Sequence, residues 1–95
     1  MENKEYEIKY TEQFYADVEA HKKSGQKAIL IKINSLINEL RKHPTTGTGK
    51  PEPLQGDRLG QWSRRITSKH RLIYEIKESE ITVLVLSGLG HYGDK

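Results

Sequence analysis

The chain has 95 residues, of which 31% are charged and 34% are hydrophobic, and its formal net charge is +3. This length predicts one small domain with a limited core, and the apolar periodicity described below favours a folded chain over a disordered one. The absence of cysteine excludes disulfides and thiolate metal sites and fits a reducing compartment. No apolar run approaches the roughly 18 residues of a membrane span, and the polar start is not typical of a signal peptide.

The positive charge is concentrated in the second half of the chain. Residues 41–71 hold eight lysines and arginines against two acidic residues, whereas residues 1–23 hold four against six. Such a basic region suggests a polyanionic partner. A solvated basic surface would give the same counts, so charge alone leaves both interpretations open.

The N-terminal residues predict a strand followed by a helix. Residues 5–10 (EYEIKY) alternate apolar and charged side chains, which is typical of a short half-buried strand. Thr11 suits the N-cap of a first helix in which Phe14 and Val18 lie on one face. We expect this helix to end near residues 21–23.

A second helix is predicted from Ser24-Gly25 onward. Isoleucines and leucines between residues 29 and 40 recur at helical spacing, with polar residues on the other side. The run AILIKI has strand propensity, but the length of the periodic pattern favours a helix. Pro44 ends it, because the residue before a proline avoids the α region. The short turn between the two helices favours antiparallel packing.

The remaining residues predict a loop and three strands. Residues 44–60 hold all three prolines and several glycines, which is typical of a loop. Strands are expected at residues 61–66, 70–77 and 80–86, in an antiparallel meander whose last and most apolar strand is central. The element order predicts a single α+β domain over residues 1–95. In it, two N-terminal helices pack on one face of a twisted, mostly antiparallel sheet.

Strand alternation predicts which residues lie on the face of the sheet opposite the helices. Leu72 and Tyr74 are apolar and should face the helices, so Arg71 should point to the open face. Arg65 has the parity expected of a solvent-facing residue in the preceding strand. A sheet face lined with arginines would be a suitable surface for RNA.

Glu52 is the sharpest candidate for catalysis because it lies between Pro51 and Pro53. The prolines restrict the backbone on both sides, and a fixed carboxylate near cations can act as a general base. Arg71 could stabilise charge on a phosphorane, since guanidinium binds two phosphate oxygens at once. The plainer alternatives are an exposed loop glutamate, which local sequence alone favours, and a surface arginine.

His91 and Tyr92 are further candidates near the end of the chain. Histidine, with an ordinary pKa near 6.5, is a natural acid for protonating a leaving alkoxide, and Tyr92 could orient it or stack on a base. Taken alone, His91 is more simply interpreted as a solvated residue. The simpler interpretation of Tyr92 is a residue that closes the edge of the sheet. Trp62 is interpreted as a core or rim anchor rather than a base-stacking residue.

Several other chemistries are not supported by the sequence. The segment GTGK lacks the spacing and following helix of a phosphate-binding loop. The four histidines lack metal-ligand spacing, so neither a metal nor another cofactor is expected. No motif supports a covalent nucleophile. A carboxylate, an arginine and an imidazole remain, and these suit RNA cleavage in which the substrate's 2′-hydroxyl is the nucleophile.

Four blocks together resemble the YoeB/Txe family of toxins, within the RelE-like endoribonucleases of bacterial toxin–antitoxin systems. They are GKPEPL (49–54), WSRRI (62–66), HRLIY (70–74) and the closing His91-Tyr92. The resemblance implies a barnase-like microbial ribonuclease fold and metal-free cleavage of messenger RNA in the ribosomal A site. It also implies a cytoplasmic protein with no membrane association. The implied partners are a cognate antitoxin of YefM/Phd-like type, the 70S ribosome with its mRNA, and a second copy in a homodimer.

The resemblance also assigns roles residue by residue. It implies Glu52 as general base, Arg71 as transition-state stabiliser, His91 as general acid and Tyr92 as its catalytic neighbour. The implied RNA-binding residues are Arg64 and Arg65, of which Arg65 is the better candidate for phosphate contact because of its strand parity. Gln55 belongs to the same RNA-binding set but lacks a charge, for which Lys50 or Arg58 could substitute.

The chain departs from the family pattern in two places. Gln55 stands where the family often has a lysine, and residues 93–95 follow the tyrosine at which many members end. A different class of function also stays open, namely a noncatalytic RNA- or ribosome-binding protein of the same fold.

Overall fold

The structure, a computed structural model, describes residues 5–90. His91 and Tyr92, the expected acid and its neighbour, lie outside the described residues. The elements in chain order are β1 (Glu7–Tyr10), α1 (Glu12–Lys23), α2 (Lys27–Leu40), β2 (Glu52–Pro53), η1 (Gly56–Arg58), β3 (Gln61–Arg65), β4 (Arg71–Lys77), η2 (Glu78–Glu80) and β5 (Thr82–Ser87).

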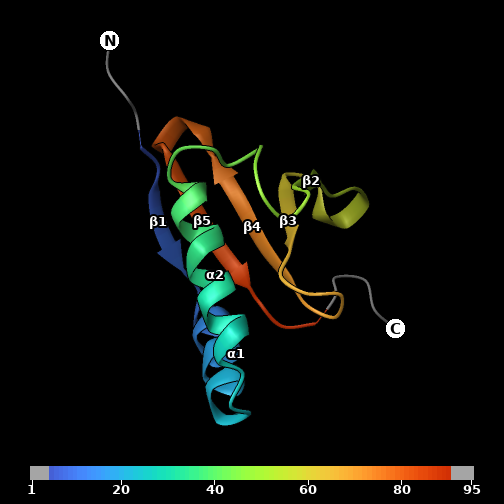
Figure 1. Ribbon diagram of the computed structural model, residues 1–95. Helices are drawn as coiled ribbons and strands as arrows, with labels where there is room; N and C mark the ends of the chain where they lie inside the picture. Colours follow the sequence, from blue (N-terminus) through green and yellow to red (C-terminus); the bar gives the residue numbers. More distant parts are fainter. Residues whose placement is uncertain (1–4, 91–95) are drawn as a thin grey trace.

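The strands form one sheet in the order β1-β5-β4-β3-β2 (Figure 1). The β1–β5 pair is parallel and the other three pairs are antiparallel. The predicted α+β architecture and the antiparallel meander of β3, β4 and β5 are therefore confirmed. β5 is interior as expected, with a partner on each side, but β4 occupies the middle of the sheet.

Both helices pack on one face of this sheet. The buried cluster joins side chains of α1 and α2 to those of β4 and β5 and includes Phe14, Leu36, Leu72, Tyr74 and Val85, and Trp62 of β3 packs against it. Neither helix within residues 5–90 is long and apolar enough to cross a membrane.

The start of α1 matches the sequence prediction. The Thr11 hydroxyl accepts a hydrogen bond from the Phe14 N–H (3.1 Å) and donates one to the Leu86 carbonyl (2.7 Å). The first bond is an N-cap, and the second ties the start of α1 to β5.

The prediction for α2 was too long at both ends, since the helix runs only from Lys27 to Leu40. At its start, Gly25 has a φ of +70°, in the left-handed region, which separates α2 from α1. At its end, Lys42 and His43 donate backbone hydrogen bonds to the Glu39 carbonyl. These bonds close a turn before Pro44 is reached.

The face of the sheet away from the helices is not wholly open. Leu54 and Ile73 are both only 3% exposed, yet neither belongs to the helix-side cluster. A second, smaller apolar region therefore supports this face near β2, while the ends of β3 and β4 carry the polar residues described next.

Candidate active site

Glu52, Arg65 and Arg71 lie on the same face of the sheet, and strand register places them there. Arg65 pairs directly with Arg71, and Glu52 pairs with Ser63. Directly paired residues point to the same side, and so do residues two apart on a strand. Arg71 alternates with Leu72, which belongs to the helix-side core, so all three residues point away from the helices. The predicted face of Arg71 is thus confirmed.

Arg65 and Arg71 form a non-hydrogen-bonded pair, the type of antiparallel pair in which the two Cα atoms are closer together. The Arg65 N–H donates to the Gly49 carbonyl (2.7 Å) and the Arg71 N–H to the Gly90 carbonyl (2.9 Å), so neither donates across the pair. Residues in such a pair have Cα atoms about 4.5 Å apart. The register therefore places two cationic side chains next to one another on this face.

Glu52 is diagonal to Arg65 across the β2–β3 pair. Diagonal neighbours lie about 7–8 Å apart, within reach of long side chains. Glu52 and Arg65 are exposed and Arg71 is half-buried. A carboxylate, an exposed guanidinium and a partly shielded one thus occupy neighbouring positions on one accessible surface.

β2 itself was missed in the sequence, where residues 44–60 were expected to form a loop. A strand of two residues has no alternation to detect, and proline is normally a strand breaker. Here Pro53 lies in a strand that, among residues 5–90, is at the edge of the sheet and pairs only with β3. The pairing matters because it fixes the face on which Glu52 lies.

Arg64 was expected to contact RNA, and that expectation is wrong for this structure. Its side chain is 0% exposed, on the helix side of β3. All five guanidinium N–H donors are used within the protein, at donor–acceptor distances of 2.5–3.3 Å. The acceptors are the Tyr74 hydroxyl, the Glu39 carboxylate and the carbonyls of His43, Thr46 and Thr48.

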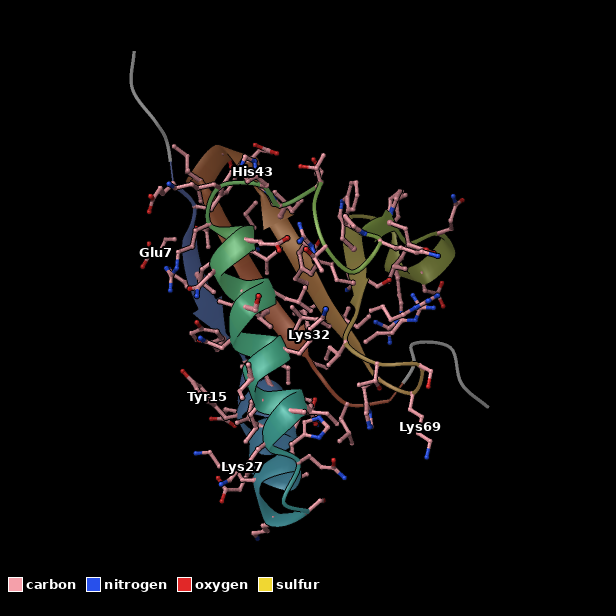
Figure 2. All side chains as sticks on the ribbon, in the orientation of Figure 1. Glu7, Tyr15, Lys27, Lys32, His43 and Lys69 are labelled. Atoms are coloured by element: carbon pink, nitrogen blue, oxygen red, sulfur yellow. The ribbon has the colours of Figure 1, made fainter. Side chains whose placement is uncertain are left out.

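These bonds make Arg64 the centre around which the loop after α2 is folded. Three of its five acceptors are backbone carbonyls of residues 43–48, and Figure 2 shows His43 in this loop just beyond α2. The same loop continues to Gly49, whose carbonyl pairs with β3, and then to Glu52. Arg64 therefore acts on the candidate site through the backbone that carries Glu52.

Glu39 and Tyr74, the two side chains that bind Arg64, have shifted pKa values. Burial raises the pKa of Glu39, but hydrogen bonds from Thr48 and Arg64 and the charge of Arg64 outweigh it, so the pKa lies below its ordinary value. Burial raises the pKa of Tyr74, and the Arg64 contact offsets this only in part. Tyr74 also donates to the Pro44 carbonyl (2.7 Å), so both partners hold the loop in place.

The glycines of GTGK, dismissed as a phosphate-binding loop, have a structural role here. A Cβ on Gly47 would lie 2.4 Å from Oε1 of Glu39, and a Cβ on Gly49 would lie 3.0 Å from the Arg65 carbonyl. Both residues also have left-handed φ values, +118° and +87°. The backbone can approach Arg64 and β3 this closely only because these positions lack side chains.

Gly49→Ala should therefore lower the free energy of unfolding by more than the left-handed conformation alone costs, which is about 1–2 kcal/mol. The matched control is Gly56→Ala, because Gly56 has a φ of +63° but nothing within 4 Å of the added carbon. Urea unfolding of both variants checks this. Equal losses would show that the contact with β3 is unimportant.

The other predicted RNA contacts lie along the same edge of the sheet. Lys50 and Gln55 are exposed, and Lys50 has a left-handed φ of 51°. Arg58 is half-buried and donates to the Gln61 side chain (3.0 Å). Lys69, in the turn between β3 and β4, projects outward (Figure 2). Lys50 and Gln55 are accessible, whereas part of the Arg58 side chain is already engaged.

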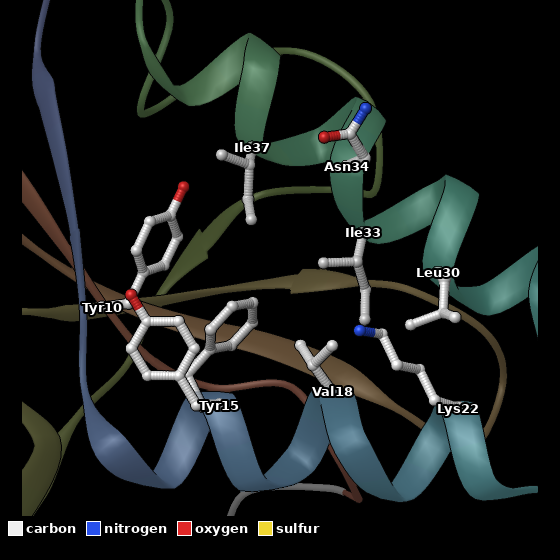
Figure 3. A pocket seen from close by; sticks show the side chains of 9 residues that line it. Tyr10, Tyr15, Val18, Lys22, Leu30, Ile33, Asn34 and Ile37 are labelled. Atoms are coloured by element: carbon white, nitrogen blue, oxygen red, sulfur yellow. The ribbon is translucent and has the colours of Figure 1, made fainter.

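A pocket of about 280 Å³ lies elsewhere, on the helix side (Figure 3). It lies between α1, α2 and β1, and Val18, Leu30 and Ile33 are among its lining residues. Glu52 and Arg71 point to the opposite face of the sheet. The candidate active site is therefore a surface on the sheet rather than this pocket.

Comparison with known proteins assigns the chain to a family. Residues 10–92 match the family described as YoeB-like toxin of bacterial type II toxin–antitoxin system. The toxin YoeB of Mycobacterium bovis is 51% identical over 53 residues, which is 56% of this chain but only 62% of that relative's length.

Solved structures agree in fold. The YoeB/ParE toxin from Agrobacterium tumefaciens superposes with a TM-score of 0.84 at 37% identity, covering 90% of this chain and 99% of that one. The YoeB–YefM complex from Staphylococcus aureus gives 0.78 at 30% identity, covering 92% and 98%. The chain belongs to the YoeB-like toxin family of bacterial type II toxin–antitoxin systems.

Proposed function

We propose that this protein is a toxin endoribonuclease that cleaves messenger RNA in the A site of the ribosome and so inhibits translation. The observation that carries the proposal is the placement of Glu52, Arg65 and Arg71 on one accessible face of the sheet. Family membership supplies the context, and the basic surface suits a nucleic acid substrate.

In the proposed reaction the substrate supplies its own nucleophile. Glu52 takes the proton of the ribose 2′-hydroxyl, and the 2′-oxygen attacks the adjacent phosphorus. The bond from phosphorus to the 5′-oxygen breaks, and His91 donates a proton to that oxygen. The products are a 2′,3′-cyclic phosphate and a 5′-hydroxyl, and no metal is needed to generate the nucleophile.

The arginines bind and stabilise the phosphate during this reaction. The closely spaced pair of Arg65 and Arg71 is suited to the extra negative charge of the phosphorane, because guanidinium groups bind phosphate oxygens bidentately. Lys50, Gln55 and Arg58 would extend the contact along the RNA from the β2 edge. Gly90, whose carbonyl accepts the Arg71 N–H, precedes His91 and Tyr92, which supports their participation at this site.

The proposed partners are the ribosome, its mRNA and a cognate antitoxin of YefM/Phd-like type, all in the cytoplasm. The Staphylococcus aureus relative was solved both as a dimer and in complex with YefM. An acidic antitoxin segment would be attracted to the basic face and cover it. A homodimer is proposed for the free toxin by the same comparison.

Induced expression in a bacterial host should arrest growth and translation, and a co-expressed cognate antitoxin should restore growth. The matched control is Glu52→Ala produced to the same level, which should be tolerated because the general base is missing. Normal growth with verified soluble wild-type protein would contradict the toxin assignment. Arrest that persists with Glu52→Ala would favour a noncatalytic ribosome-binding protein.

A further inference from the structure

The segment that follows β5 is held by hydrogen bonds at both of its described glycines. The Gly88 N–H donates to Oδ2 of Asp17 (2.9 Å), and the Gly88 carbonyl lies 3.0 Å from Nε2 of His21. The Gly90 N–H donates to Nδ1 of His70 (2.9 Å), and its carbonyl accepts the Arg71 N–H (2.9 Å). All four backbone polar groups of these glycines are therefore paired, immediately before His91.

The side chains that bind Gly88 are buried and come from α1. Asp17 is 4% exposed and His21 is 2% exposed, and they lie one helical turn apart on the same face as Phe14. A Cβ on Gly88 would lie 3.3 Å from the Phe14 ring. Buried polar side chains are costly unless they are hydrogen-bonded, so these two residues hold residues 88–90 against α1 rather than fill the core.

The bond to His70 specifies the protonation state of its imidazole. A backbone N–H can only donate, so Nδ1 of His70 must present its lone pair to Gly90. An imidazolium has a proton on both ring nitrogens and cannot accept this bond. The Gly90 contact therefore exists only while His70 is neutral.

His21 is linked to the same arrangement. The Gly88 carbonyl can only accept, so Nε2 of His21 carries the proton in their bond. The two imidazole rings meet edge to face with centroids 4.9 Å apart. Among the described residues, His21 on α1 contacts the His70 ring, and Lys69 and Arg71 are its neighbours in the chain.

We propose that His70 is a positioning residue whose neutral form holds the segment leading to His91 beside Arg71, and whose protonation releases it. Because only the neutral imidazole can accept this bond, the anchor should be weaker at pH 5.5 than at pH 7.5. The catalytic consequence rests on the proposed role of His91, whereas the anchoring itself does not. The toxin would then lose activity in an acidified cytoplasm for a conformational reason.

The anchoring is tested by amide hydrogen exchange on the free protein, with rates corrected for the intrinsic effect of pH. The protection factor of Gly90 should fall about tenfold between pH 7.5 and 5.5, because protonation of the released histidine, whose ordinary pKa is about 6.5, competes with closure. Gly88, bonded to Asp17, should change less than Gly90 and serves as the internal reference. A Gly90 protection factor that does not depend on pH would overturn the proposal.

Two substitutions separate the hydrogen bond from the bulk of the side chain. His70→Asn keeps an acceptor near the position of Nδ1 but does not titrate, so Gly90 should stay protected at both pH values. His70→Leu keeps volume but removes the acceptor, so Gly90 should be poorly protected at both. Protection of the β4 and β5 amides reports whether each variant is folded. Equal Gly90 protection in folded His70→Leu and wild type would contradict the anchor.

The catalytic consequence is tested on programmed ribosomes at pH 7.5. His70→Leu should lower kcat about tenfold with little change in KM, since a small misplacement of a catalytic group slows the chemical step. His70→Asn should have most of the wild-type kcat. An unchanged kcat in a variant whose Gly90 has lost protection would refute the positioning role. Absence of cleavage by the wild type would instead contradict the proposed function, while exchange still decides the anchor.

Discussion

Glu52→Ala should lower the rate of mRNA cleavage by about 10²–10⁴-fold, the range expected when a general base is lost. His91→Ala should fall in the same range as the loss of the general acid. Glu52 is exposed and pairs only at the sheet edge, so the fold should tolerate its loss. The measurement is single-turnover cleavage on programmed ribosomes, because the ribosome contributes to positioning the substrate in the proposed mechanism.

Arg71→Ala should lower the rate of mRNA cleavage by about 10²–10³-fold, because the substitution removes a group that stabilises charge in the transition state. Arg71→Lys should recover only part of the rate, because lysine lacks the planar fork that binds two phosphate oxygens. The matched control is Glu19→Ala, an exposed glutamate on the helix side, which should cleave at the wild-type rate.

The chemical products decide the mechanism independently of these rates. The upstream fragment should end in a 2′,3′-cyclic or 3′-phosphate and the downstream fragment should begin with a 5′-hydroxyl. Cleavage should also survive a chelator. A 5′-phosphate product, or loss of all activity on chelation with ribosomes intact, would overturn the mechanism, and an unimpaired Glu52→Ala would remove that residue from the base role.

Arg64→Ala should lower the free energy of unfolding by about 2–5 kcal/mol, because truncating a fully buried side chain leaves a cavity and removes the donor from several acceptors at once. The substitution leaves Glu39, Tyr74 and three loop carbonyls without their donor. A domain of this size has a total stability of about 5–14 kcal/mol. Urea unfolding should therefore show a protein near its stability limit, and the loop that carries Glu52 should be disturbed first.

The neighbouring arginine is the matched control for this change. Arg65→Ala removes an exposed guanidinium from the same strand, and surface substitutions usually change stability by no more than about 0.5 kcal/mol. Arg65→Ala should thus reduce cleavage without reducing stability, whereas Arg64→Ala should reduce stability and, through the loop that carries Glu52, cleavage as well. Equal stability of the two variants would mean that the Arg64 contacts do not hold the loop.

The Glu39–Arg64 pair also makes stability depend on pH in a definite direction. The pKa of Glu39 is lowered from its ordinary 4.5 in the folded protein. Its contribution is therefore fully present above pH 4.5 and is lost as the pH falls through the lower, folded-state pKa. Glu39→Gln should flatten this part of the acid unfolding curve, and an unchanged curve would exclude Glu39 as its source.

The sequence by itself determined the elements that depend on local periodicity. The Thr11 cap and the apolar faces of the two helices specified the helical layer, and alternation in β4 specified that Arg71 lies on the opposite face. The glutamate between two prolines and the blocks around it identified the candidate residues. These features were predictable because the physical cause of each lies within a few neighbouring residues.

Strand parity already favoured Arg65 over Arg64 as the exposed arginine of WSRRI, but only the tertiary structure showed what Arg64 binds and found the anchor at residues 88–90. Arg64 and Arg65 have nearly the same local sequence, but the acceptors that bury Arg64 come from α2, the loop after it and β4. Asp17 and His21 likewise find their partners at Gly88, 71 and 67 positions away in the chain, which no local pattern indicates. Whether a polar side chain binds solvent, substrate or backbone depends on which distant groups fold against it, because burial of a charge is stable only when those groups satisfy it.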